Sequence, residues 1–169
     1  MKLSEIQILY QASDDPSERM EYISALVDIE QADWSLIEAF AASALLTDDN
    51  PIVRHEAAFV LGELRETDRI SDEVGAAALR QAAQLDISAV VRHEATEALY
   101  CFCGDSIDAT LRQCLEDEDE DVRLTAAMSL SWRDRWKRDA DTIERLRDNG
   151  RIQESAFVKA MTACRNEAE

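Results

Sequence analysis

The sequence predicts an all-α protein, a short α-solenoid of about five helical hairpins stacked side by side. The chain has 169 residues with only 4 Gly and 2 Pro, a composition that favours helices. Apolar residues recur at intervals of three and four along nearly the whole chain, without convincing strand alternation. Similar segments return every 30 to 38 residues, which is typical of stacked two-helix repeats.

The predicted helices follow one another with turn signals between them. The apolar spacing predicts helices over residues 3–12, 16–30, 33–46, 51–65, 72–85, 88–103, 106–116, 120–136, 139–148 and 152–166. Pro16 and Pro51 fit the first turn of a helix, where a missing N–H group costs nothing. Because no Gly- or Ser-rich linker divides the chain, residues 1–169 are expected to form a single domain.

A regular pairing of aspartate with arginine runs through three successive repeats. Each aspartate lies in a turn and precedes its arginine by six residues: Asp48 and Arg54, Asp86 and Arg92, Asp117 and Arg123. Such pairs can hydrogen-bond across the stack and set the register of the repeats, so we interpret these arginines as structural. The spacing, with Val before the Arg, resembles the HEAT-repeat signature over roughly residues 14–166 and implies a HEAT-like solenoid.

The chain is strongly acidic, with a net charge of −18. Such a surface repels the phosphates of nucleic acids and anionic lipids, and it favours a cationic ligand or partner. With no run of about 18 apolar residues and no signal-peptide pattern, no membrane contact and a cytoplasmic location are expected. The four cysteines form no C-x-x-C pair and are interpreted as small buried residues in a reducing compartment.

Two identical segments, Val53–Ala57 and Val91–Ala95, hold the only two histidines of the chain, each followed by a glutamate. Because stacked repeats place equivalent positions side by side, the two His-Glu pairs are expected to be neighbours. Imidazole and carboxylate together suit Fe, Mn, Co or Zn rather than Ca or Mg. The predicted metal ligands are His55, Glu56, His93 and Glu94.

Helical geometry places both histidines on the side of their helices opposite the apolar stripe. The same outward side holds Phe59 and Gly62 in the first helix, and Glu97 and Tyr100 in the second. Among these residues, Phe59, Glu97 and Tyr100 are candidates for lining a substrate groove. Two alternatives to a metal site are histidines satisfied within the core and histidines that are unrelated surface residues.

The segments Arg54–Gly62 and Val90–Leu99 resemble consecutive iron-binding repeats of deoxyhypusine hydroxylase. That family consists of HEAT-repeat di-iron monooxygenases with four His-Glu motifs. The resemblance implies iron as the cofactor and the two His-Glu pairs as metal ligands or their close neighbours. Because this chain carries two of the four motifs, it implies one iron per chain, or a diiron centre completed by a homodimer. The same repeats also resemble bilin-lyase-type HEAT-like proteins, which bind a partner or a pigment.

Three functional hypotheses follow from the sequence. The first is an iron-binding, dioxygen-activating hydroxylase whose substrate is a protein or another cationic ligand. The second is a metal-free adaptor that binds a protein partner on its concave face. The third is a protein that stores or senses metal without turnover. Two further segments allow a binding and a structural interpretation: the acidic run Glu116–Asp121 and the basic, aromatic segment 132–138.

Overall fold

The computed structural model describes residues 1–29, 33–70, 73–102, 104–131 and 147. The chain divides into two compact units, Met1–Phe102 and Cys103–Glu169. The described residues are helical with no strand among them, which confirms the predicted all-α solenoid. None of the helices in this part of the chain is long and apolar enough to cross a membrane.

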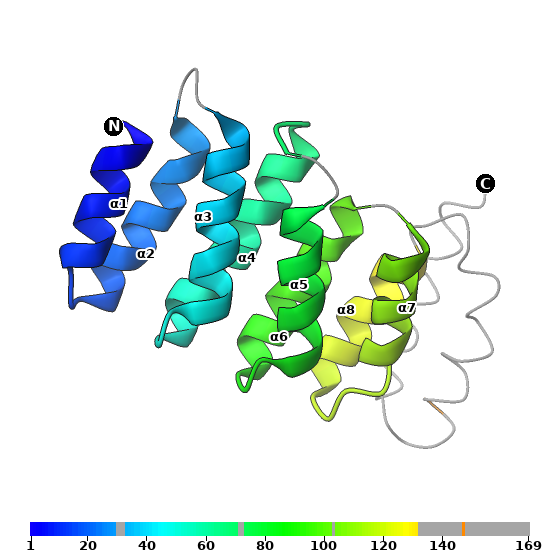
Figure 1. Cartoon of the computed structure of the whole chain (residues 1–169). Helices are drawn as coiled ribbons and strands as arrows, with labels where there is room; N and C mark the ends of the chain where they lie inside the picture. The colour runs from blue at the N-terminus through cyan, green and yellow to red at the C-terminus, as the bar shows by residue number, and fades with distance from the viewer. Residues whose placement is uncertain (30–32, 71–72, 103, 132–146, 148–169) are drawn as a thin grey trace. The chain divides into compact units, whose positions relative to one another are not determined.

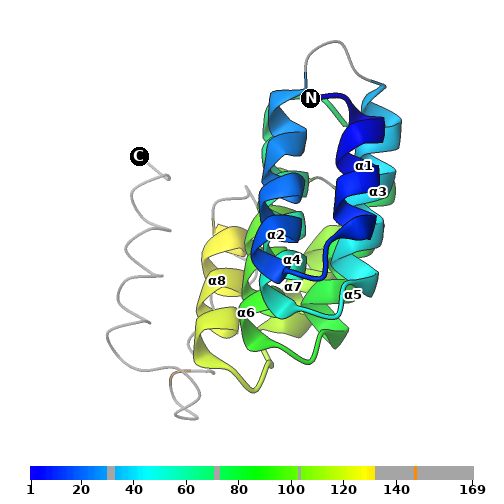
Figure 2. The same ribbon diagram turned by 90° about the vertical axis from the view of Figure 1, so that its left-hand side faces the viewer.

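The first unit holds three helical hairpins. Its helices are α1 (Leu3–Ala12), α2 (Pro16–Ser24), α3 (Trp34–Thr47), α4 (Pro51–Glu66), α5 (Val74–Leu85) and α6 (Ala89–Ala98). Short 3-10 turns, Ala25–Asp28 and Leu99–Cys101, extend α2 and α6. The helices α1, α3 and α5 form one layer and α2, α4 and α6 the other (Figures 1 and 2).

The described part of the second unit is one hairpin of α7 (Asp105–Cys114) and α8 (Glu120–Ser131), which pack against each other. The helix predicted over 152–166 and the segment 132–138 lie outside the described residues, as does the helix predicted over 139–148 apart from residue 147. All eight described helices begin within two residues of their predicted start.

Turn residues cap the starts of α2, α3 and α4 in the first unit. Asp15 and Asn50 each accept a hydrogen bond of 2.9 Å from the backbone N–H two residues further on, and Pro16 and Pro51 occupy the first helical positions. The N-cap residues of α5 and α6 make no side-chain cap. At the start of α5, Glu38 of α3 accepts a 2.7 Å hydrogen bond from the backbone N–H of Gly75 instead.

The hydrophobic core lies between the two layers and follows the apolar stripes of the sequence. The stripe of α4 is fully buried: Val53, Ala57, Val60, Leu61 and Leu64. The prediction that Gly62 lies on the outward side of α4 is wrong. A Cβ atom at Gly62 would lie 3.2 Å from the Cβ of Ala98, because α6 packs closely against that flank of α4. As expected for a core thiol, Cys114 is buried, whereas Cys101 is only half-buried.

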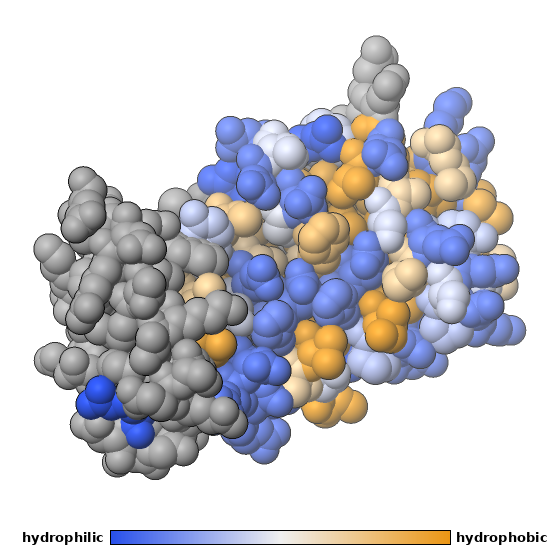
Figure 3. Space-filling model, turned by 180° about the vertical axis from the view of Figure 1, so that it is seen from behind, coloured by the Kyte–Doolittle hydropathy of each residue, from blue (hydrophilic) through white to orange (hydrophobic). Residues whose placement is uncertain are grey.

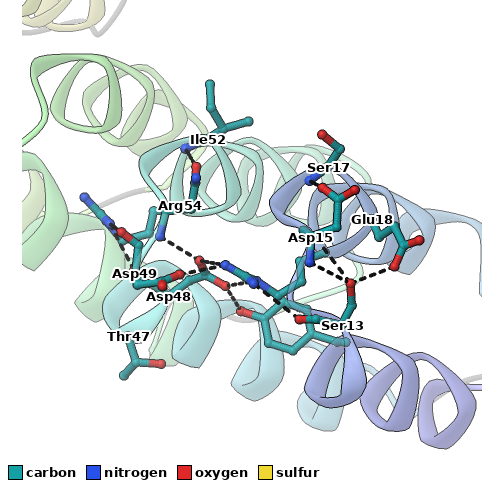
Figure 4. Close-up of polar contacts among 12 residues, drawn as sticks. Ser13, Asp15, Ser17, Glu18, Thr47, Asp48, Asp49, Ile52 and Arg54 are labelled. Atoms are coloured by element: carbon teal, nitrogen blue, oxygen red, sulfur yellow. Dashed lines mark hydrogen bonds and ion pairs between the residues drawn. The ribbon is translucent and has the colours of Figure 1, made fainter.

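Hydrogen bonds between aspartates and arginines of the sequence pattern connect neighbouring hairpins. Arg54 donates two hydrogen bonds, of 2.7 and 2.8 Å, to the carboxylate of Asp86 in the following hairpin. Its third nitrogen, Nη1, donates to the backbone carbonyls of Asp48 and Asp49 in its own turn (Figure 4). The aspartates and arginines of the pattern therefore hydrogen-bond across the stack, but in other pairs than the sequence predicts. The carboxylate of Asp48 accepts hydrogen bonds from Arg19 rather than from Arg54.

Arg19 makes the same contacts one hairpin earlier, although the sequence pattern did not include it. It donates to both carboxylate oxygens of Asp48, at 2.9 and 3.1 Å, and to the backbone carbonyl of Ser13. Arg92 and Arg123 likewise donate to the backbone carbonyl six residues before them. We call Arg19, Arg54, Arg92 and Arg123 the arginine ladder.

Candidate metal centre

His55 of α4 and Glu94 of α6 meet where these two neighbouring helices pack. The Nε2 atom of His55 lies 3.2 Å from Oε2 of Glu94. Both side chains are partly covered, and Glu94 is the more deeply placed of the two. The hydrogen bond to Glu94 raises the pKa of His55 above its usual value, although burial of the imidazole opposes the shift. The negative charges of Glu94, Glu56 and Glu97 add to the increase.

Three residues of α6 gather on the same side of that helix. His93, Glu94 and Glu97 each offer one ligand atom, and these atoms all lie within 4.8 Å of one another. Ligands bound to a transition metal at about 2.1 Å lie about 3 to 4 Å apart, so small side-chain rotations would close this group around an ion. Because Glu97 is exposed, the group opens to solvent on one side.

The structure therefore places two of the four predicted ligands, His93 and Glu94, in one group of possible ligand atoms, and a third, His55, in contact with Glu94. We call His55, His93, Glu94 and Glu97 the His-Glu cluster. Glu97 was expected in a substrate groove, yet its carboxylate completes the group on α6. The signal for this role is its spacing: residues four apart on a helix, such as His93 and Glu97, lie on the same face.

The fourth predicted ligand, Glu56, makes a different contact. Its Oε1 atom accepts a hydrogen bond of 2.5 Å from the hydroxyl of Ser24, at the end of α2. The same hydroxyl oxygen lies 3.1 Å from the backbone carbonyl of Met20 within its own helix. Glu56 is thus engaged with the preceding hairpin, although it is close enough to His55 to favour the charged imidazole.

Phe59 and Tyr100, the aromatic candidates for a substrate groove, belong to α4 and to the turn that follows α6. Each is 45% exposed, which is high for a large aromatic side chain. Figure 3 looks onto the layer of α2, α4 and α6, where hydrophobic side chains stand among hydrophilic ones. This surface therefore combines exposed aromatic rings with carboxylates.

The acidic run Glu116–Asp121 has the structural role expected of a turn. Asp117 accepts a hydrogen bond from the backbone N–H of Asp119, and Asp119 accepts from the backbone N–H groups of Asp121 and Val122. The carboxylate of Asp119 thus caps the start of α8, where the helix dipole favours negative charge.

The stacked hairpins, with a core between two helical layers, define an α-helical repeat protein. Residues 6–100, more than half of the chain, match the HEAT-repeat family. The chain belongs to this family of HEAT-repeat proteins. None of the curated proteins compared with the chain matches it. The likeness to deoxyhypusine hydroxylase therefore stays a prediction, carried by the two His-Glu segments.

Proposed function

We propose that this HEAT-repeat protein binds one transition-metal ion at the His-Glu cluster between α4 and α6. The observation that carries the proposal is the position of Glu94. Its carboxylate contacts His55 at 3.2 Å and belongs to the same group of ligand atoms as His93. Both histidines of the chain therefore border one carboxylate, although 38 residues separate them in the sequence.

The donor set decides which ions fit. Two imidazoles and two carboxylates suit Fe, Mn, Co or Zn better than Ca or Mg, which prefer oxygen ligands alone. Histidine binds a metal only in its neutral form, so metal binding must release the proton that Glu94 stabilises on His55. Glu97 lies on the exposed side, where an ion would also remain accessible to water or a substrate.

Within this proposal the ion is iron and the protein is a dioxygen-activating hydroxylase. Two histidines with carboxylate ligands and open positions are typical of non-haem iron oxygenases. The residues of this chain would hold the ion, keep one side open and attract a cationic substrate through the surrounding carboxylates. Iron, when bound, supplies the reaction with dioxygen.

Metal binding is tested by titrating the apo protein with Fe(II) under nitrogen and measuring stoichiometry and affinity. We expect about one ion per chain, and a fall in affinity of at least about tenfold in His93→Ala and in His55→Ala. The matched control is Glu66→Gln, an exposed carboxylate at the end of α4, which should bind as the wild type does. Equal affinities in all four proteins, or no binding, would contradict the proposal.

Turnover needs a separate measurement. Oxygen consumption by the iron-loaded protein, supplied with a reductant and lysine-rich peptides, separates a hydroxylase from a protein that only stores or senses metal. Consumption that requires both iron and His93 supports the hydroxylase. Stoichiometric iron binding without consumption supports storage or sensing.

A second candidate function is a metal-free adaptor that binds a protein partner on the layer of α2, α4 and α6. The exposure of Phe59 and Tyr100 favours it, because exposed aromatic residues are common at the centres of protein interfaces. This candidate predicts that Phe59→Ala weakens partner binding, whereas His93→Ala and chelators leave it unchanged.

A further inference from the structure

The outer face of α3 and α5 is almost uncharged, although the chain as a whole carries a net charge of −18. The single charged residue within α3 is Glu38, which is 4% exposed and bonded to Gly75. The single charged residue within α5 is Arg80, which is half-buried. The two helices pack against each other, so together they present one continuous surface. We call the exposed residues of α3 and α5, with Ile87, the neutral face.

Large apolar side chains stand at both ends of the neutral face. Leu36 and Val74 are exposed near the helix starts, and Leu46 and Leu85 near the helix ends. Between them the exposed residues are small or uncharged: Ala39, Ser43, Ala77 and Gln81. Leu85 is 72% exposed and Ile87, just beyond α5, is 92% exposed. A surface of this kind is unusual on an acidic protein and is typical of an interaction site.

A notch of about 230 Å³ opens at the end of this face, between the last turns of α3 and α5. Its apolar lining comes from Leu45, Leu46, Ala82, Leu85 and Ile87. Its polar lining comes from the exposed Gln81 and from three charged residues, Arg54, Asp48 and Asp86, whose charges already pair within the arginine ladder. An apolar side chain would therefore fill the notch without separating an ion pair.

We propose that the neutral face docks a second copy of this chain in a twofold homodimer. In such a dimer the same patch meets itself, so a projecting side chain and a notch on one patch can fill each other. Ile87 projects beside the notch and has the size and polarity to enter the notch of the partner copy. Burial of Leu36, Leu46, Leu85 and Ile87 supplies the driving force.

Charge favours this face over the opposite one for contact between two copies. Two chains of −18 repel each other, and the repulsion is smallest where the meeting surfaces carry no charge. The layer of α4 and α6 presents carboxylates instead: Glu56, Glu63, Glu66, Glu94 and Glu97. A dimer through the neutral face leaves the two His-Glu clusters apart, so each chain would hold its own ion rather than share a diiron centre.

The test is sedimentation equilibrium of the apo protein over a range of concentrations and salt. We expect a monomer–dimer equilibrium whose dissociation constant falls as salt rises, because salt screens the repulsion and leaves the apolar contact intact. Leu85→Glu and Leu36→Glu should each raise the dissociation constant at least about tenfold, since each loses a buried leucine and adds a charge. Ile52→Glu is the matched control, because Ile52 on α4 is 52% exposed and Leu36 on α3 is 56% exposed.

Circular dichroism of each variant verifies that the fold is retained, which the exposure of both leucines favours. A wild-type monomer at every concentration and salt would overturn the proposal. So would a dimer that Ile52→Glu dissociates and that the two leucine variants leave intact, since that result would place the contact on the opposite layer. The experiment contains no metal, so its outcome is independent of the proposed metal site.

Discussion

The guanidinium of Arg54 binds the carboxylate of Asp86 through two parallel hydrogen bonds and so joins the second hairpin to the third. Both side chains are more than nine-tenths buried. The remaining nitrogen of Arg54 donates to the carbonyls of its own turn, so each of the three guanidinium nitrogens makes a hydrogen bond. Two-point contacts of this kind fix the direction as well as the distance between hairpins.

Replacing Asp86 with alanine is expected to destabilise the fold by about 3 kcal/mol, because it leaves a buried guanidinium without its partner. The measurement is the free energy of unfolding from urea denaturation. Asp49→Ala is the control, since Asp49 pairs with Arg19 at 2.6 Å but is almost fully exposed. Equal losses in the two variants would show that burial of the ladder adds nothing to its strength.

The aspartates that pair with the arginine ladder also make the stability of the fold depend on pH in the acidic range. Burial disfavours ionisation of Asp86, but hydrogen bonds from Arg54 and the backbone of Ser88 hold its pKa below the usual value. Arg19, Tyr10 and the backbone of Asn50 lower the pKa of Asp48 in the same way. A carboxylate with a lowered folded pKa stabilises the fold above its unfolded pKa of 3.8, and this stabilisation is lost as pH falls through the folded pKa.

We therefore expect the free energy of unfolding to fall as the pH drops from about 5 to 2, with a shallower slope in Asp86→Asn. The slope reports the difference in bound protons between the unfolded and folded states. Urea titrations at several pH values measure it. A slope in Asp86→Asn equal to that of the wild type would contradict a role of this carboxylate in acid unfolding.

The sequence predicts most of this ladder but not its first member. The search for aspartate six residues before arginine passes over Arg19, because Ser13 stands at that position. In the structure the contact across six residues is made by the backbone carbonyl, which every residue has. The carboxylates of Asp48 and Asp86 instead accept hydrogen bonds from the arginine of the preceding hairpin. No ladder arginine precedes Ser13 in the sequence, so no aspartate is needed at that position.

As with the arginine ladder, the sequence predicts part of the His-Glu cluster. Matching registers of His55 and His93 predict that the two segments are neighbours, and the contact between His55 and Glu94 agrees. Helix periodicity alone did not assign Glu56, because its contact with Ser24 depends on which side chain of α2 packs opposite it. The prediction that Gly62 faces outward was wrong for the same reason. Periodicity gives the direction of a side chain but not the neighbouring helix that covers it.

The contact between Glu38 and Gly75 leads to a further prediction. Glu38 supplies from α3 the cap that α5 lacks, and its charge lies at the positive end of the helix dipole. Glu38→Ala should destabilise the fold by about 1 to 3 kcal/mol, because a buried N–H group loses its acceptor. Glu38→Gln keeps an acceptor oxygen and should lose less. Thermal unfolding of both variants measures the difference, and identical losses would refute the capping role.

The raised pKa of His55 gives the most direct test of the His-Glu cluster. Since the hydrogen bond to Glu94 is its main cause, Glu94→Gln should move the pKa of His55 back toward the ordinary 6.5. Glu66→Gln, on the exposed end of α4, should leave it raised. Because the chain has only two histidines, an NMR titration resolves both, and a His93→Gln variant assigns the signals.

The raised pKa of His55 also determines how folding stability and metal binding change with pH near neutrality. A histidine whose folded pKa is raised stabilises the fold fully below its unfolded pKa of 6.5, and this stabilisation disappears as pH rises through the folded pKa. Metal binding should show the opposite trend, strengthening as His55 loses its proton over the same range. If Fe(II) affinity did not vary with pH across the titration of His55, the imidazole would not be a ligand, even if the pKa itself were raised.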